Sequence, residues 1–216
     1  KGFTTAKHKD AFANVLKALR SGLKDQYMVS WRVVNTADCG LPQNRPRLYI
    51  IGMLRGAIQN DKRFKWPRPV GCVPLESLLE KDVCAQDYQP TPGTTSSKNL
   101  RMLIRRQANA EPSIHPLCFD VFASKKRAAQ VRPMVGLVPC LTRTRAGCGG
   151  YWVTGVNRLL TTREMLRLQG LTQQFIEYAA AANVSDRQLR QMIGNGMSVN
   201  VLVAILSRVL PAVGLG

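Results

Sequence analysis

Two arginines stand two residues apart in residues 43–47, directly before the apolar run at residues 48–51. Side chains at positions i and i+2 of an extended segment point to the same side. Arg45 and Arg47 would therefore present two planar guanidinium forks together, and such forks suit a phosphate or the carbonyl edge of a base. A surface pair bonded to loop carbonyls explains the same residues equally well, so this motif alone leaves both interpretations open.

A glycine-rich turn at residues 194–196 precedes the last helical pattern of the chain. A turn of this kind at a helix N-terminus presents backbone N–H groups to a polar or anionic ligand. The side chains of Asn195 and Ser198 would add hydrogen bonds to such a ligand. Gly-Asn-Gly is also common at simple helix junctions, so the turn by itself is a weak indication.

Two capping-box patterns predict helix starts near the C-terminus: Thr161 with Glu164, and Ser185 with Gln188. The apolar positions that follow predict a last helix ended by Pro211. In the first third, periodicity predicts a helix over 6–21, with Thr5 as cap and Gly22 at its end, a strand over 27–35 and a short buried strand at 48–51. Residues 58–150 favour short strands in an irregular lobe, with a loop or linker over 90–97.

Lysine and arginine number 31 against 13 acidic residues, a formal net charge of +18. An excess of this size suggests a polyanionic partner, most often nucleic acid, although a solvated basic surface, a ribosomal protein and a membrane-surface protein remain alternatives. The apolar run at 201–206 is too short to span a bilayer. The six cysteines are predicted to be reduced thiols, and a zinc site formed by His115, Cys118, Cys140 and Cys148 is the less favoured interpretation, so no metal is expected.

Taken together and in order, these segments resemble the C-terminal blocks of the DNA cytosine-5 methyltransferase family. Residues 37–52 are similar to its Gln-x-Arg-x-Arg block, 158–170 to its penultimate block and 194–201 to its last block, while 139–145 with Tyr151 and Trp152 resemble the end of its target-recognition region. The resemblance implies an α/β fold: the C-terminal part of a Rossmann-like, S-adenosylmethionine-dependent catalytic domain with an inserted target-recognition lobe. The expected divisions are 1–57 and 151–216 for the catalytic domain and 58–150 for the lobe.

The resemblance implies methyl transfer from S-adenosyl-L-methionine to carbon 5 of a cytosine flipped out of duplex DNA. In it, Arg47 would bind the cytosine carbonyl, and Arg45 would support the active-site loop or a phosphate. The cofactor would be contacted by Gly194, Asn195, Ser198 and Val199. Expected DNA contacts are Gln43, Arg101, Arg105, Arg143 and Arg145.

In the family, a cofactor loop, a Pro-Cys nucleophile block and a Glu-Asn-Val block would precede Lys1. The chain is therefore expected to be a C-terminal part that is inactive alone, whose partners are duplex DNA and the missing N-terminal half. Cys140 follows Pro139 but lacks the residues expected after a nucleophile, so it is not assigned that role. A cytosine-5 methyltransferase of transfer RNA and a non-catalytic DNA-binding module are the alternatives. The expected location is intracellular, in a nucleus or nucleoid, without a membrane partner.

Overall fold

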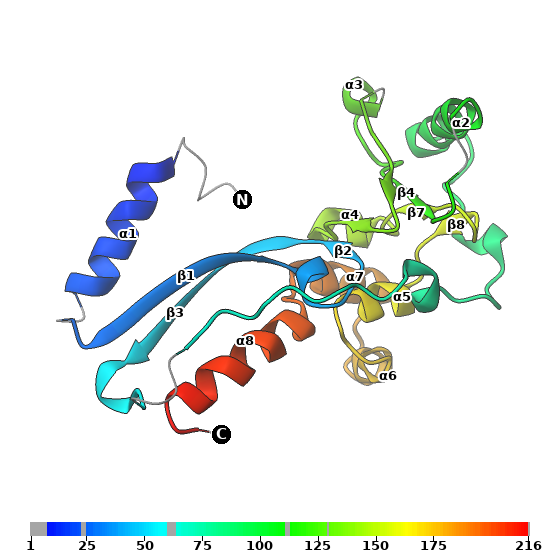
Figure 1. Ribbon diagram of the computed structural model, residues 1–216. Coiled ribbons are helices and arrows are strands. Elements are labelled where there is room, and N and C mark those ends of the chain that lie inside the picture. The colour runs from blue at the N-terminus through cyan, green and yellow to red at the C-terminus, as the bar shows by residue number, and fades with distance from the viewer. Residues whose placement is uncertain (1–7, 23–24, 60–63, 111–112, 129, 216) are drawn as a thin grey trace.

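The computed structural model describes residues 8–22, 25–59, 64–110, 113–128 and 130–215. Figure 1 shows a long two-stranded hairpin at one end of the molecule and a small sheet with two helices at the other, with the shorter helices between them. The mixed α/β architecture agrees with the predicted fold class of a partial methyltransferase domain.

The hairpin pairs strand β1 (Tyr27–Asn35) with strand β3 (Pro46–Leu54), antiparallel along the whole length of both. Because successive side chains of a strand face opposite ways, Val34 points to one face and Trp31 to the other. Helix α8 (Val199–Ala212) covers the first face, where Val201 and Ile205 join Val34 in a core cluster. Helix α1 (Lys9–Ser21) reaches the second, where Phe12 meets Trp31 edge-on at a centroid distance of 4.7 Å.

Three expectations about these elements need correction. The predicted buried strand at 48–51 is the middle of a nine-residue strand, and Ile50 is 38% exposed because the face that it shares with Trp31 is only partly covered. Helix α1 begins at Lys9, while the predicted cap Thr5 lies outside the described residues; Gly22 is the C-cap as expected. Pro211 does not end α8 but lies in its last turn, before Ala212.

The lobe contains one long helix and a four-stranded sheet of short strands. Helix α2 (Thr95–Ala108) begins after Thr94, whose side chain caps it, so the predicted loop at 90–97 ends at Thr94 and its last three residues are helical. The sheet has the order β5 (Met134–Val135), β4 (Leu117–Phe119), β7 (Trp152–Val153), β8 (Arg158–Leu159). It crosses the expected division at residue 150, because β7 pairs with β4.

Several single turns and short elements connect these parts. They are the 3₁₀ turns η3 (Thr36–Asp38), η4 (Arg55–Ala57), η5 (Leu75–Leu78) and η6 (Ala85–Tyr88), helix α3 (Lys125–Ala128), and the parallel pair β2 (Gln43–Asn44) with β6 (Val138–Pro139). Within residues 58–150 the strands are short, as predicted, but helix α2 is a long regular element that the sequence did not predict.

The centre of the molecule is formed by helices α4 (Arg143–Gly147), α5 (Thr162–Leu168), α6 (Gln174–Ala181) and α7 (Asp186–Asn195). Both predicted capping boxes are present, at the N-termini of α5 and α7. A core cluster that includes Leu141, Leu160, Met165 and Leu168 holds these helices together.

By length and composition alone, the 27-residue stretch Asp186–Ala212 would be able to cross a membrane. The structure divides it into α7 and α8, and the extended backbone of Gly196 (φ −63°, ψ 164°) separates the two helices. Helix α7 packs against α4, and α8 packs against the hairpin. We therefore describe the stretch as two helices of the folded domain.

Candidate active site

Arg45 is the centre of a polar junction, although it is only 2% exposed. Its Nη2 donates to the carbonyls of Gly194 at 3.0 Å and Gly196 at 2.6 Å, and its Nη1 donates to the carbonyl of Leu141. Its backbone N–H donates to Asn35 Oδ1 at 2.7 Å. Burial lowers the pKa of Arg45, with a smaller contribution from the neighbouring Arg47, but a guanidinium stays protonated in proteins. Arg45 thus joins the arginine segment to the glycine turn.

Arg47 lies beside this junction and is partly exposed. Its Nη2 approaches Cys140 Sγ at 3.2 Å, and Arg45 Nη1 approaches the same sulfur at 3.6 Å. Nη1 of Arg47 also donates to the carbonyl of Pro46 at 3.0 Å. The two guanidinium groups therefore point to the same side, as the i, i+2 spacing predicted. Arg45 bonds loop carbonyls, as one of the two alternatives expected, but it is buried and not on the surface, whereas Arg47 is partly exposed and its binding role stays a prediction.

A second set of bonds joins the end of α5 to the glycine turn. Ser198 Oγ donates to Gln169 Oε1 at 2.7 Å and lies 2.7 Å from Thr36 Oγ1, while Gln169 Nε2 donates to the carbonyl of Ile193 at 3.0 Å. The backbone N–H of Val199 donates to the carbonyl of Gln169 at 2.9 Å. Asn200 Nδ2 donates to the carbonyl of Cys39 at 2.7 Å, so residues from all three sequence blocks meet at one place.

Gly194 is required by close packing. A Cβ atom at this position would lie 2.5 Å from the carbonyl oxygen of Thr142 and 2.6 Å from the backbone nitrogen of Arg143. Only glycine lets α7 approach the start of α4 this closely, and its carbonyl is taken by Arg45. The packing of α7 on α4 therefore depends on the absent side chain.

The four residues expected to bind the cofactor do not form a cofactor cavity by themselves. Ser198 is 1% exposed with its hydroxyl engaged by Thr36 and Gln169, and the backbone N–H of Val199 is engaged by Gln169. Gly194 is buried against α4. Only Asn195 has an exposed side chain, and it lines a shallow hollow of about 320 Å³ with Arg143. S-adenosylmethionine thus does not fit a site made of these four residues alone.

The expected DNA contacts differ in their accessibility. Arg101 and Arg105 are exposed on α2, and Arg143 is exposed at the start of α4. Arg145 is half-buried and pairs with Asp120 at 3.0 Å. Gln43 is fully buried, and its Nε2 donates to the carbonyl of Leu168 at 3.1 Å. The expectation that Gln43 reaches DNA disagrees with this position, because its side chain points into the protein.

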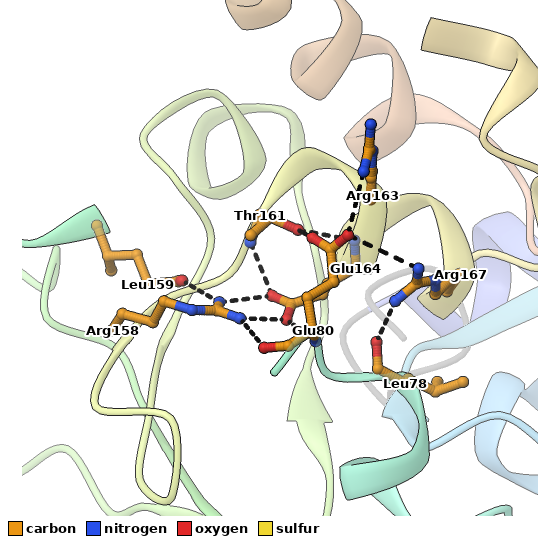
Figure 2. Close-up of polar contacts among 8 residues, drawn as sticks. All are labelled: Leu78, Glu80, Arg158, Leu159, Thr161, Arg163, Glu164 and Arg167. Carbon is orange, nitrogen blue, oxygen red and sulfur yellow. Dashed lines mark hydrogen bonds and ion pairs between the residues drawn. The ribbon is translucent and has the colours of Figure 1, made fainter. Parts of the chain in front are cut away.

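A buried ion pair that the sequence did not predict stabilises the start of α5 (Figure 2). Arg158 and Glu164 are both 0% exposed and form two hydrogen bonds, at 2.9 and 2.7 Å. The Glu164 carboxylate also accepts from the backbone N–H groups of Thr161 and Glu80, at 2.8 and 2.7 Å. Burial lowers the pKa of Arg158, but its hydrogen bonds to Glu164 and the charge of that carboxylate outweigh burial and raise it overall.

Glu80 extends this pair to the surface of the lobe. Its carbonyl accepts from Arg158 Nη2 at 2.7 Å, its carboxylate accepts from Thr161 Oγ1 at 2.6 Å, and Arg163 and Arg167 approach the carboxylate at 3.6 and 3.7 Å. The capping box identified Glu164, but no signal in the sequence links Glu80, 78 positions upstream, to Arg158. Within the described residues, no group of three or more His, Cys, Asp and Glu side chains is arranged to hold a metal ion.

The family model for C-5 cytosine-specific DNA methylases matches residues 1–210. The chain belongs to this family. It is 33% identical over 219 residues to type II methyltransferase M.NgoBI of Neisseria gonorrhoeae, covering 98% of this chain and 60% of the relative. It is 32% identical over 195 residues to type II methyltransferase M.HaeII of Haemophilus aegyptius, covering 89% and 54%. The chain therefore spans somewhat more than half the length of these relatives.

Solved structures give the same fold. The structure of the Dnmt2 methyltransferase of S. pombe superposes with a TM-score of 0.60 at 16% identity, covering 98% of this chain and 65% of that one. The Entamoeba histolytica methyltransferase EhMeth superposes with a TM-score of 0.57 at 16% identity, covering 93% and 57%. These structures confirm the expected fold, while the family itself is shown by the match over residues 1–210.

Proposed function

We propose that this chain forms the cytosine-binding and DNA-reading part of a DNA (cytosine-5-)-methyltransferase. The observation that carries the proposal is the junction at Arg45, which brings the arginine segment, the lobe residue Leu141 and the turn at Gly194 and Gly196 together. Three segments far apart in the sequence thus meet at Arg45, and the partly exposed guanidinium of Arg47 lies beside this junction, against Cys140. Because the chain belongs to the family of C-5 cytosine-specific DNA methylases, we assign this arrangement to the binding of cytosine.

The two arginines would divide the work between them. Arg45 bonds three carbonyls and is buried, so it holds the site in shape. Arg47 would donate hydrogen bonds to the carbonyl at carbon 2 of a flipped cytosine, since a guanidinium fork suits this acceptor. Positive charge at this oxygen would stabilise the electron density that builds up in the ring as carbon 5 becomes nucleophilic.

Exposed basic residues would hold the DNA. Arg101, Arg105 and Arg143 are accessible, whereas Arg145 is already neutralised by Asp120 and would contribute less. The net charge of +18 supports a polyanionic substrate. Such a protein would act inside the cell where DNA is, in a nucleus or nucleoid.

The methyl donor implied by the family is S-adenosyl-L-methionine, which supplies the methyl group for carbon 5. Of the four residues expected to contact it, Asn195 alone has an exposed side chain that would do so, because Ser198, Gly194 and Val199 are engaged in internal contacts. The remaining cofactor contacts, the nucleophile and the acid that engages ring nitrogen 3 would come from other parts of the catalytic domain.

Those other parts would pack on apolar surface that the described chain leaves open. Trp31 and Ile50 form a cross-strand pair on the hairpin and are 40% and 38% exposed, and Val203 and Leu206 on α8 are 61% and 46% exposed. Exposed apolar surface of this kind favours association with another part of the protein. We therefore propose the N-terminal half of the catalytic domain as the partner of these faces.

Tritiated methyl transfer to duplex DNA tests the proposal. We expect none from the chain alone and measurable transfer after it is mixed with the N-terminal half of a type II relative. Binding to DNA should weaken steeply with added salt, because each neutralised phosphate releases counterions. Transfer RNA should compete poorly with duplex DNA; stronger competition by transfer RNA, or a flat salt response, would contradict the proposal.

A further inference from the structure

A pocket of about 510 Å³ lies between α2 and the sheet of the lobe, away from Arg47. Its walls are mainly apolar: Leu100 and Ile104 come from α2, and Phe119 and Trp152 from β4 and β7. The rings of Phe119 and Trp152 pack together at a centroid distance of 5.8 Å. Apolar pockets of roughly 300–1,000 Å³ with a few polar groups at the rim are typical small-molecule sites. The pocket therefore suits one flat ring system.

Trp152 provides a buried donor in the wall of this pocket. The side chain is only 5% exposed, and its Nε1 has no hydrogen-bond partner in the part of the chain that the structure describes. Buried donors are nearly always paired, and an unpaired one costs free energy. Because Nε1 is itself closed to solvent, a bound heterocycle would pair with it only where the pocket lining opens slightly, and this pairing would then add to the affinity. The side-chain amide of Gln107 lies at the rim and offers both donors and an acceptor.

Positive charge flanks the apolar wall. Arg101 and Arg105 are exposed and each follows a lining residue, Leu100 and Ile104, on α2. On a helix, positions four apart lie on the same side, so the two arginines form a short basic edge along one border of the pocket. A ligand that combines a flat ring with a phosphate would use both features.

We propose that this pocket holds one unstacked base of a DNA strand, with the adjoining phosphates at Arg101 and Arg105. The inference rests on the proposed DNA function but concerns a base other than the target cytosine. Bases bind to proteins by stacking on apolar and aromatic side chains between basic backbone contacts. A purely apolar ligand would leave both the basic edge and the indole N–H unused, so the nucleic-acid strand fits better.

Binding of two fluorescein-labelled duplexes by the whole chain tests the proposal. One duplex is fully paired, and the other carries a single bulged 2-aminopurine nucleotide. We expect the bulged duplex to bind about tenfold more tightly, as one stacked base contributes, and the 2-aminopurine emission to fall on binding. Ile104→Trp fills the pocket and should remove the preference, and Trp152→Phe, which lacks the N–H, should reduce it. Met102→Trp adds the same bulk to an exposed position outside the pocket lining and should preserve it.

Equal affinities for both duplexes, unchanged by Ile104→Trp, would overturn the inference about the pocket. Salt-dependent binding of the paired duplex in the same experiment would still support the proposed function. Failure to bind either duplex would instead contradict the proposed function. The monophosphate of 2-aminopurine deoxyriboside, added as a competitor, separates the two sources of the ring. If it binds as tightly as the bulged strand, the pocket is a mononucleotide site and the strand proposal is wrong.

Discussion

Removing the carboxylate of Glu164 is expected to be among the most damaging changes in the chain. Glu164 is 0% exposed, and its two oxygens accept from Arg158 Nη1 and Nη2 and from the backbone N–H groups of Thr161 and Glu80. The substitution Glu164→Ala would leave a buried guanidinium charge without its counterion. It would also strand two backbone donors, one of them at the N-cap of α5.

The size of the effect follows from this environment. Breaking a buried ion pair by removing one partner costs about 3–5 kcal/mol, because the remaining charge stays desolvated. A domain of ordinary stability has a free energy of unfolding of about 5–15 kcal/mol, so the variant would lose a large fraction of it. The double variant Arg158→Met with Glu164→Leu removes both charges but takes their side-chain partners from the N–H groups of Thr161 and Glu80 and from the carbonyls of Leu159 and Glu80, all of which are neutral groups. It should therefore lose less, about 1–3 kcal/mol.

Urea denaturation followed by circular dichroism gives the free energies of unfolding for Glu164→Ala and for the double variant. Asp25→Asn is the control, because it breaks the ion pair of Asp25 with Arg55, whose side chains are 78% and 54% exposed. That change should cost less than about 1 kcal/mol. If Glu164→Ala also costs less than about 1 kcal/mol, or if the double variant is less stable than Glu164→Ala, the argument from buried charge is refuted.

Three further changes test other parts of the structure. Gly194→Ala should lower the free energy of unfolding in urea denaturation by about 1–3 kcal/mol, because its Cβ would lie 2.5 Å from the Thr142 carbonyl. Gly56→Ala is the control and should be nearly neutral, since no atom lies within 4 Å of the added Cβ. Equal effects of the two substitutions would contradict the packing argument. Arg45→Lys should lower the unfolding free energy by about 1–3 kcal/mol, since an ammonium cannot satisfy the same three carbonyls. Arg47→Lys should leave stability nearly unchanged and lower methyl transfer by the complemented enzyme. The reverse pattern would mean that the two arginines have each other's role. Burial raises the pKa of Cys118 from 9.0 to about 12, so the folded state keeps a proton that the unfolded state loses, and stability should fall by about 1.4 kcal/mol per pH unit between roughly pH 9 and 12. Urea midpoints at pH 8.5 and 10.5 measure this slope, which Cys118→Ala should reduce and exposed Cys84→Ala should leave unchanged.

Local signals in the sequence predicted the elements that local interactions determine. The capping boxes at Thr161 and Ser185 are correct because side chains three residues apart form the whole motif. Strand β1 matches its predicted bounds, since alternation along one strand is also local. The burial of residues 48–51 was predicted wrongly, because burial depends on which elements cover the strand and not on its own residues.

The candidate site was predictable only in part for the same physical reason. The spacing of Arg45 and Arg47 predicts that their side chains point to the same side. Only the fold shows that the Arg45 guanidinium donates its hydrogen bonds to the carbonyls of Leu141, Gly194 and Gly196. Gln43 and Ser198 have side chains that suit a ligand, yet each is buried and bonded within the protein. Residue type gives the capacity to bind, whereas exposure decides whether that capacity is available.

Arg45 and Arg47 differ in how many protein groups hold them in place, and both contact the segment that joins the lobe to the site. Leu141 and Cys140 belong to the segment that leads from β6 of the lobe region into α4, and Arg45 and Arg47 both contact this segment. Tyr151 fixes it from the other side by donating its hydroxyl to the Cys140 carbonyl at 2.8 Å. Arg45 has further acceptors at the glycine turn, whereas within the described residues the other acceptor of Arg47 is the carbonyl of its neighbour Pro46. A displacement of the lobe on DNA would therefore move Cys140 and change the position of Arg47 first. The arginine that would touch the cytosine is thus the one whose position depends most on the lobe that would read the DNA.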